Sequence, residues 1–280
     1  MRMLGVAIFC FALAGCQSKK SASLHIDASL EALVPADTIG VAGADVDAIR
    51  GTPVYRQLVT HFDAAQIARF KAASKVLFCW DGKRGLVLAR GKFSRADIEI
   101  GSSFDYKNHR LFGDESGAVV LLNDSTVAAG PAGELRSLID REGNRGLPPA
   151  LADLLRTLPA SDQIYAALTG GLEELTRNLP QNGNLANFRS VDSATLGLDL
   201  KNGIQAVARM NSKSEGDAKF IHDMLRGMIG FARLRTPDNQ PDLLKLYDAI
   251  NVTQQQTQTQ VTADIPADQV DRFLDLLPKR

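Results

Sequence analysis

The sequence predicts an α+β protein built as a tandem duplication of one structural unit, and two observations carry that prediction. Three stretches of the chain recur in the same order, the later copies lying 121 to 135 positions after the earlier ones. Within them, alternating apolar patterns joined by turn residues are followed by segments of helical period. The hairpins imply a mostly antiparallel sheet, and the helices between them imply that one face of the sheet is covered.

The first recurring stretch predicts a strand followed by a helix. Residues 32–53 and 156–180 both place a Leu, a Pro and an acidic residue ahead of an alternating apolar segment. Both then take a helical period that ends at a proline. Pro35 and Pro159 occupy equivalent places and lie 124 positions apart.

The second recurring stretch predicts a β-hairpin. Residues 70–94 and 188–214 each begin with Phe and a basic residue and continue as strand, tight turn, strand and polar exit. The turn residues tolerate a positive φ, which two-residue hairpin turns require. These turns are Asp81-Gly82 and Asn202-Gly203, whose glycines lie 121 positions apart.

The third recurring stretch predicts a hairpin and a closing helix, in residues 117–141 and 251–277. Pro131 and Pro266 stand where each helix begins, a position that proline favours. They lie 135 positions apart, which is 14 more than the hairpin glycines. A long segment of helical period at 215–234 accounts for this excess, so the second copy is expected to contain a longer helix.

Each copy is therefore expected to run strand, helix, hairpin, helix of variable length, hairpin, helix. The first repeat is placed at 32–145 and the second, with the longer helix, at 146–280. Their boundary lies in a stretch rich in Gly, Pro and charge near 142–150. The pattern leaves open whether the two halves share one sheet or form two lobes.

The chain begins with the features of a secretory signal peptide, predicted at 1–15. Arg2 is the only charge before Cys16, and residues 4–12 are almost wholly apolar. That apolar run is too short to span a bilayer, which takes about 20 apolar residues. A short basic start, a short apolar core and small residues at the end are typical of export signals.

The residues that end this signal, Leu13-Ala14-Gly15-Cys16, resemble the lipobox of bacterial lipoproteins. The resemblance implies that the Cys16 thiol receives a diacylglycerol, that cleavage occurs just before it, and that Cys16 is the lipidation site through which the protein binds a membrane. Gln17 in place of Asp points to the outer membrane, facing the periplasm. Residues 16–31 are expected to form the lipidated cysteine and a polar tether.

Composition and motifs exclude several classes of function. Lys and Arg total 32, as do Asp and Glu, so no basic surplus indicates nucleic acid as a partner. The chain has no phosphate-binding loop, nucleophile elbow or zinc-ligand spacing, so we predict no catalytic residues, cofactor or metal. Cys79 lies in an apolar run and is expected to be a buried, inert thiol. The four histidines stand singly: His25, His61, His109 and His222.

Two further patterns have a structural and a functional interpretation. One of Asp45 and Asp47 is expected to cap the helical segment that follows, as are Asp97 and Asp217, because a carboxylate there accepts backbone N–H groups, and capping is favoured over cation binding. Met224, Met228 and Phe231 form an apolar stripe on the long predicted helix. Such a stripe is usually core, and the alternative is a groove for lipid or peptide.

The layout of the mature part resembles uncharacterised duplicated α+β proteins among exported bacterial lipoproteins, and a likeness of layout implies no activity. We therefore expect a membrane-anchored lipoprotein with a non-enzymatic binding or structural role in the cell envelope. An envelope protein or an apolar ligand is the expected partner. The alternatives are a hydrolase-type enzyme with dispersed catalytic residues and a carrier of an apolar ligand.

Overall fold

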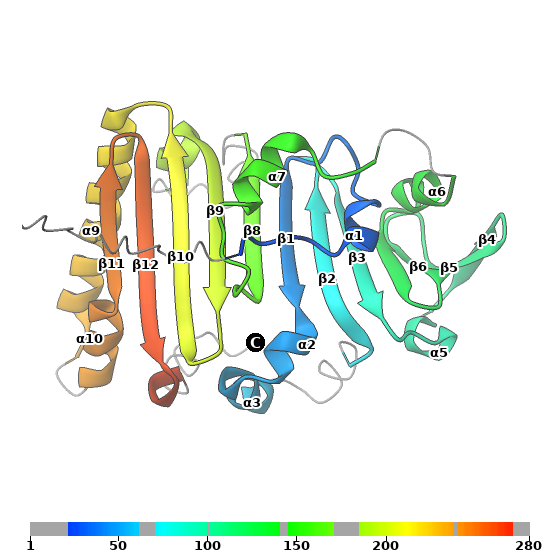
Figure 1. The fold of residues 1–280 in the computed structure, drawn as a ribbon, viewed down its shortest axis with the longest axis horizontal. Helices are drawn as coiled ribbons and strands as arrows, with labels where there is room; N and C mark the ends of the chain where they lie inside the picture. Colours follow the sequence, from blue (N-terminus) through cyan, green and yellow to red (C-terminus); the bar gives the residue numbers. More distant parts are fainter. Residues whose placement is uncertain are drawn as a thin grey trace, which may run out of the picture.

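The computed structural model describes residues 22–61, 71–99, 101–140, 145–170, 185–237 and 240–270. These residues form one twelve-stranded sheet with the strand order β11-β12-β10-β9-β8-β1-β2-β3-β7-β6-β5-β4 (Figure 1). Every pairing in it is antiparallel. The predicted α+β class is confirmed, and the two halves share one continuous sheet.

In the described part of its first half, the chain forms seven strands and several short helices. In order they are α1 (Ala28–Glu31), β1 (Gly40–Asp45), α2 (Val46–Arg50), α3 (Pro53–Leu58), η1 (Val59–His61), β2 (Ala73–Trp80), β3 (Gly85–Gly91), α5 (Arg95–Ile98), β4 (Ser103–Tyr106), β5 (His109–Gly113), β6 (Ala118–Asn123), β7 (Thr126–Gly130) and α6 (Ala132–Asp140).

The described residues of the second half form five strands, the long helix α9 and shorter helices. In order they are α7 (Pro149–Leu155), β8 (Ile164–Thr169), η2 (Leu185–Ser190), β9 (Val191–Asp199), β10 (Gly203–Ser212), α9 (Glu215–Arg235), α10 (Pro241–Asp248), β11 (Ile250–Gln255), β12 (Gln258–Pro266) and η3 (Ala267–Gln269).

The strand order repeats when it is read outward from the central pair β1–β8. One side runs β1, β2, β3, β7, β6, and the other runs β8, β9, β10, β12, β11. Each recurring sequence stretch thus supplies the same strands in both halves. β1 begins at Gly40 and β8 at Ile164, the same 124-position offset that separates Pro35 from Pro159.

The halves differ where the spacing of the recurring stretches changes. The long helix expected at 215–234 is present as α9, and α10 follows it. The first half instead carries the short α5 and the hairpin β4–β5, which adds two strands at the sheet edge and was not predicted. Its turn offers no glycine signal, because the positive φ of 51° falls on Lys107.

The predicted helices are found only in part among the described residues. Proline opens α6 as expected, whereas Pro266 is followed by the 3-10 turn η3. The helix expected after β1 is divided into α2 and α3. Its counterpart after β8 and the rest of the closing helix fall on 171–184 and 271–280, outside the described residues.

The start of the folded domain corrects the expected extent of the tether. Leu24, Ile26 and Leu30 are buried in the main core. The Leu24 amide donates to the Leu158 carbonyl at 2.9 Å, and Ser23 forms a β-bridge with Pro159. Residues 22–31 therefore belong to the fold, because buried apolar side chains hold them there. The signal peptide and Cys16 lie outside the described residues.

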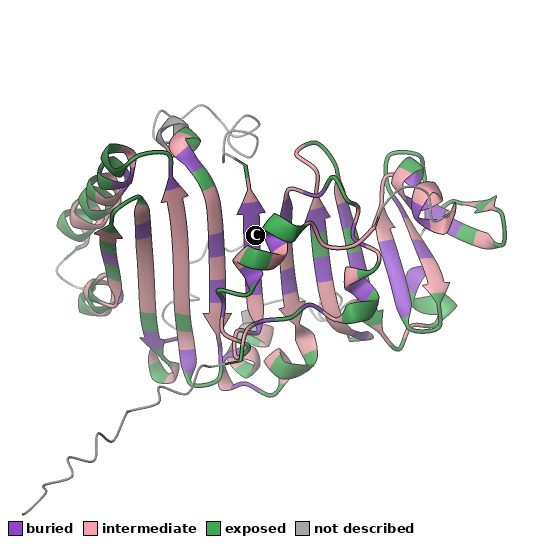
Figure 2. Ribbon diagram, turned by 45° about the horizontal axis from the view of Figure 1, so that its top comes forward, coloured by how far each residue is buried: buried purple, intermediate pink, exposed green. Residues whose placement is uncertain are grey.

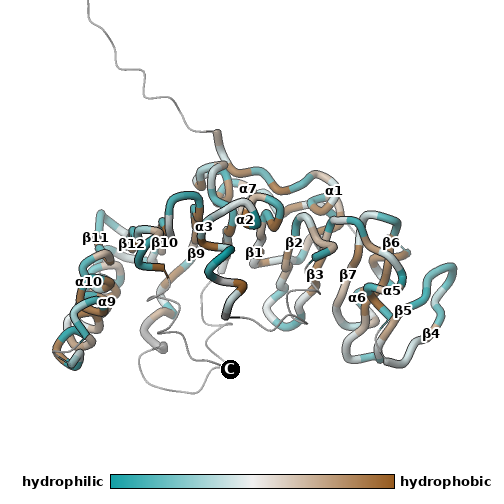
Figure 3. Tube along the Cα trace, turned by 90° about the horizontal axis from the view of Figure 1, so that it is seen from below, coloured by the Kyte–Doolittle hydropathy of each residue, from teal (hydrophilic) through white to brown (hydrophobic). Residues whose placement is uncertain are grey.

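Helices pack on both faces of the sheet, whereas we expected one covered face. The α7 face, which bears Val41, Leu77 and Tyr165, holds the main core with α1, α6 and α7. The α9 face bears Ala42, Phe78 and Ala166, which alternate with these residues along the same strands. Figure 3 shows α7 and α1 on one side of the sheet and α9 and α10 on the other.

Helix α9 is placed on its face by one buried hydrogen bond. The Thr259 hydroxyl donates to the Ala218 carbonyl at 2.9 Å, and Thr259 pairs with Met210 across β12 and β10. Farther along this face, Val54 of α3 clusters with Leu198 of β9. Among the described residues, no helix is both long and apolar enough to cross a membrane.

Candidate apolar binding site

The register of the central strands places apolar residues in continuous rows across the α9 face. Residues paired in an antiparallel ladder point to the same side, so each row follows from the pairings of neighbouring strands. One row contains Met210, Ala194, Leu168, Gly40 and Trp80. The next row contains Ala208, Leu196, Ala166, Ala42 and Phe78.

These strands are apolar on both faces, which is unusual for an antiparallel sheet with one face open to water. The intervening residues on the α7 face, such as Val41 and Cys79, are buried. On the α9 face Phe78 remains 39% exposed, and Val87 beside it on β3 is exposed as well. In Figure 2 the central strands carry buried and intermediate residues along most of their length. Apolar surface of this kind marks binding sites.

The two rows line a hollow of about 590 Å³. This volume lies in the range of ligand pockets, roughly 300–1,000 Å³. No charged residue lines the hollow within the described chain. Its floor is made of small residues, Gly40, Ala42, Ala166, Ala194 and Ala208, and larger apolar side chains surround them, namely Trp80, Phe78, Leu168, Leu196 and Met210.

The stripe on α9 is not part of the core, contrary to the favoured interpretation of the sequence. Ala218 and Ile221 are the buried residues of this helix. Within the stripe, Met228 and Phe231 are exposed and Met224 is half-buried, and Phe220 of the same helix is exposed as well. The helix therefore packs on the sheet through one side and presents a second apolar side to its surroundings.

The residues considered for chemistry from the sequence are dispersed or structural. The predicted burial of Cys79 is confirmed, and this burial raises the pKa of the thiol to about 12. His25 contacts the Ser23 carbonyl at 2.8 Å, and His222 contacts Asp223 at 2.8 Å. Within the described ranges, no cluster of three or more His, Cys, Asp or Glu side chains is arranged to hold a metal.

Asp45, Asp97 and Asp217 lie at helix starts, and the predicted capping is confirmed for Asp45, whereas Ser94 and Ser214 are the N-caps of the other two helices. Asp45 caps α2 by accepting the Ala48 amide at 3.1 Å. Asp97 is the third residue of α5 and accepts the amide of the N-cap residue Ser94 at 2.7 Å, which forms a capping box. Asp217 accepts the Ser214 hydroxyl at 2.6 Å, and that serine is the N-cap of α9. All three carboxylates therefore organise helix starts.

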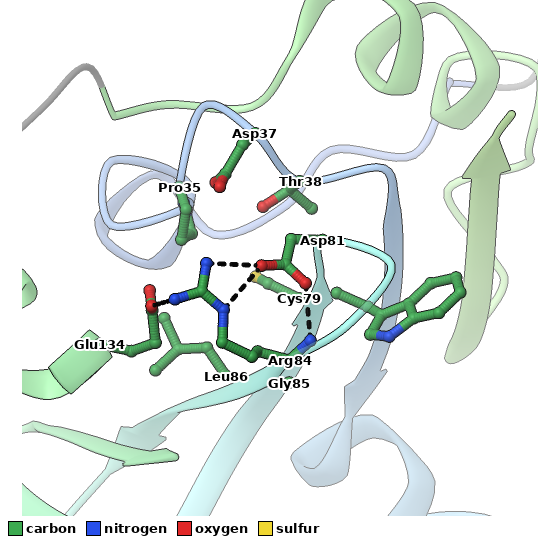
Figure 4. A pocket seen from close by; sticks show the side chains of 10 residues that line it. Pro35, Asp37, Thr38, Cys79, Asp81, Arg84, Gly85, Leu86 and Glu134 are labelled. Atoms are coloured by element: carbon green, nitrogen blue, oxygen red, sulfur yellow. Dashed lines mark hydrogen bonds and ion pairs between the residues drawn. The ribbon is translucent and has the colours of Figure 1, made fainter. Parts of the chain in front are cut away.

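A polar hollow at the end of the β2–β3 hairpin has a structural explanation (Figure 4). Arg84 donates to the Asp81 carboxylate from Nε at 3.0 Å and from Nη2 at 2.8 Å. Its other amino group pairs with Glu134 of α6. The hollow has a volume of about 10 Å³, which holds one water at most. This ion-pair network fastens the hairpin turn to α6 and leaves no room for a substrate.

Neither a protein-family model nor a curated protein matches the chain. Three crystal forms of a protein titled TP0453 resemble it in fold. Form I has a TM-score of 0.50 and 13% identity, covering 91% of this chain and 98% of that one. Form III has a TM-score of 0.54 and 12% identity, covering 90% and 99%. Form IV has a TM-score of 0.52 and 12% identity, covering 87% and 95%. At this identity the likeness shows the fold alone.

Proposed function

We propose that this protein is an exported lipoprotein, which acyl chains on Cys16 anchor to the outer membrane so that it faces the periplasm. We also propose that its α9 face binds an apolar ligand without catalysing a reaction. The observation that carries the binding role is the uncharged hollow over the central strands. The lipobox carries the anchoring role. Two or more acyl chains hold a protein at a membrane durably, because each buried methylene contributes about 0.8 kcal/mol.

The shape of the hollow favours an alkyl or acyl chain as the ligand. The rows cross five strands from β10 to β2, a width of about 19 Å at the usual spacing between strands. The small side chains of the floor let a narrow chain lie close to the backbone, and Trp80 and Met210 end one row. Burying such a chain is favourable by about 0.8 kcal/mol per methylene.

Trp80 is the only tryptophan of the chain and lines the hollow, so it reports binding directly. We expect palmitate to shift its fluorescence to shorter wavelength, and a brominated fatty acid to quench it with saturation. Ala166→Leu fills the floor and is expected to abolish the effect. Ala150→Leu, at an exposed position of α7, is the matched control and leaves it unchanged. Absence of saturable quenching in the unmodified chain contradicts the binding role.

The anchor is tested separately. Cells producing the protein are labelled with radioactive palmitate and fractionated into membrane and soluble parts. The unmodified chain is expected to carry the label and sediment with the outer membrane, and Cys16→Ser to lose both properties. Cys79→Ser is the control, because that thiol is buried in the folded domain. Membrane association of the unlabelled Cys16→Ser protein contradicts the anchoring mode.

A further inference from the structure

The α7 face contains a hollow of about 370 Å³ between the N-terminal segment and the strands β1, β2 and β8. It is polar, unlike the hollow on the α9 face. Its ionisable and hydroxyl-bearing side chains are Ser23, His25, Asp27, Asp45, Lys75, Asp162 and Tyr165. Of the three carboxylates, Asp45 and Asp27 have ion-pair partners, so the charge that is not balanced by an ion pair in the described chain is that of Asp162.

Tyr165 is a buried polar side chain in this hollow that lacks a partner. Its relative exposure is 8%, and burial raises the pKa of its hydroxyl. The ring lies over Gly43, where an added Cβ would come 2.2 Å from Cζ and 2.3 Å from the hydroxyl oxygen. No described residue forms a hydrogen bond with the hydroxyl, which is open to the hollow. The tyrosine thus offers an unused donor and acceptor to whatever enters the hollow.

Asp162 is the second side chain of the hollow that has no hydrogen-bond or ion-pair partner among the described residues. A Cβ at Gly197 would lie 1.9 Å from its Oδ2, so the absence of a side chain at 197 makes the space that the carboxylate occupies. Gly197 is also the ladder partner of Tyr165. Within the described chain, no hydrogen bond or ion pair engages the Asp162 carboxylate. Burial, with Asp199 nearby, raises the pKa of this carboxyl, and the positive charges of Arg209 and Lys201 oppose the rise without reversing it.

The other charges of the hollow already have partners. Lys75 donates to Asp45 at 2.6 Å, and Arg90 donates to Asp27 at 2.8 Å. An anionic ligand would meet the unpaired carboxylate of Asp162 and be repelled. A cation with N–H groups would instead supply the counter-charge for Asp162 and a donor for the Tyr165 oxygen.

We propose that this hollow binds a small organic cation that carries N–H donors, a primary or secondary amine in its ammonium form. Its N–H groups donate to the Asp162 carboxylate and to the Tyr165 hydroxyl oxygen. Gly43 and Gly197, on the strands either side of Tyr165, leave the room that these two side chains need. The site lies on the opposite face from the apolar hollow and does not depend on the proposed function.

Calorimetric titration of the processed chain, residues 16–280 in detergent, tests the site with butylammonium chloride at constant ionic strength. We expect saturable binding that weakens at least about tenfold in Asp162→Asn, because an ion pair with hydrogen bonds is lost. Tyr165→Phe keeps the ring over Gly43 and is expected to weaken binding severalfold. Asp153→Asn removes an exposed carboxylate of α7 and is the control, with unchanged affinity.

A second ligand and a second type of measurement test whether the N–H donors of the cation and the strands around Tyr165 are involved in binding. Tetramethylammonium has the charge without N–H donors, and we expect it to bind at least about tenfold more weakly. Amide resonances of Gly43 and Gly197 in the unmodified chain give a readout that does not depend on any variant folding, and butylammonium should shift both. Absence of saturation, unchanged affinity in Asp162→Asn, equal binding of tetramethylammonium, or unmoved Gly43 and Gly197 resonances each overturns the proposal.

Discussion

Gly43 of β1 lies directly beneath the phenol ring of Tyr165 on β8, its partner in the central ladder. A side chain at 43 cannot coexist with the ring in this position, because its Cβ would be 2.2 Å from Tyr165 Cζ. The β1–β8 pair joins the two halves of the sheet. Packing at this junction therefore depends on a strand position that has no side chain.

We predict that Gly43→Ala lowers the free energy of unfolding by about 1–3 kcal/mol, because the ring must move within a packed core. Thermal unfolding followed by circular dichroism measures the loss. Gly133→Ala is the control: the residue is in helix α6, and apart from the backbone of that helix and the two neighbouring residues no atom lies within 4 Å of its added Cβ. That variant should gain about 0.5–1 kcal/mol. If Gly43→Ala is as stable as the unmodified chain, the Tyr165 ring does not lie against Gly43 as described.

Residues 22–31 are predicted to stabilise the fold, because they belong to the hydrophobic core and not to a flexible tether. Leu30 is 1% exposed, so Leu30→Ala should cost about 2–5 kcal/mol, measured by urea unfolding. Leu234→Ala makes the same chemical change at a position that is 87% exposed on α9, and should cost less than about 0.5 kcal/mol. Similar losses in both variants would contradict the burial of residues 22–31.

Much of the sheet was predictable because its signals are local. The turns expected at Asp81-Gly82 and Asn202-Gly203 are present, with φ of 97° at Gly82 and 131° at Gly203. The long helical period matches α9 almost to the residue. The β4–β5 hairpin was missed because its strands are short and a lysine occupies the turn position with positive φ. Propensity rules have no signal for such a turn.

The two hollows were not predictable, because tertiary pairing creates them. Asp162 and Gly197 are far apart in sequence and meet only through the β8–β9 register, and neither belongs to a motif. The rows of the α9 face likewise depend on register, since a shift of one residue would turn them to the other face. One signal was available: the run from Val76 to Trp80 is apolar at every position, which indicates a strand with two apolar faces.

The Cys79 thiol is predicted to make stability fall at high pH. Its pKa is about 12 in the folded chain against 9.0 without burial, so below pH 9 both states hold the proton. Between pH 9 and 12 the unfolded chain releases the proton first, and unfolding becomes more favourable. The stability difference between the unmodified chain and Cys79→Ala should therefore shrink by up to about 1.4 kcal/mol per pH unit in urea titrations. A difference independent of pH would contradict this burial.

Asp27 is predicted to lose its contribution to stability in acid. Burial opposes ionisation, but hydrogen bonds from Ser29 and Arg90 outweigh it and lower the pKa of the carboxyl below 3.8. The ionised form therefore stabilises the fold above about pH 4, and this contribution disappears as the pH falls through the folded pKa. Asp27→Asn retains a helix-capping oxygen and should cost about 0.5–1 kcal/mol at pH 7, and the cost should be smaller at pH 2. Urea unfolding at both pH values measures this, with Asp153→Asn as an exposed control that should change little at either. If Asp27→Asn lowers the free energy of unfolding equally at pH 7 and pH 2, the charge of Asp27 does not stabilise residues 22–31.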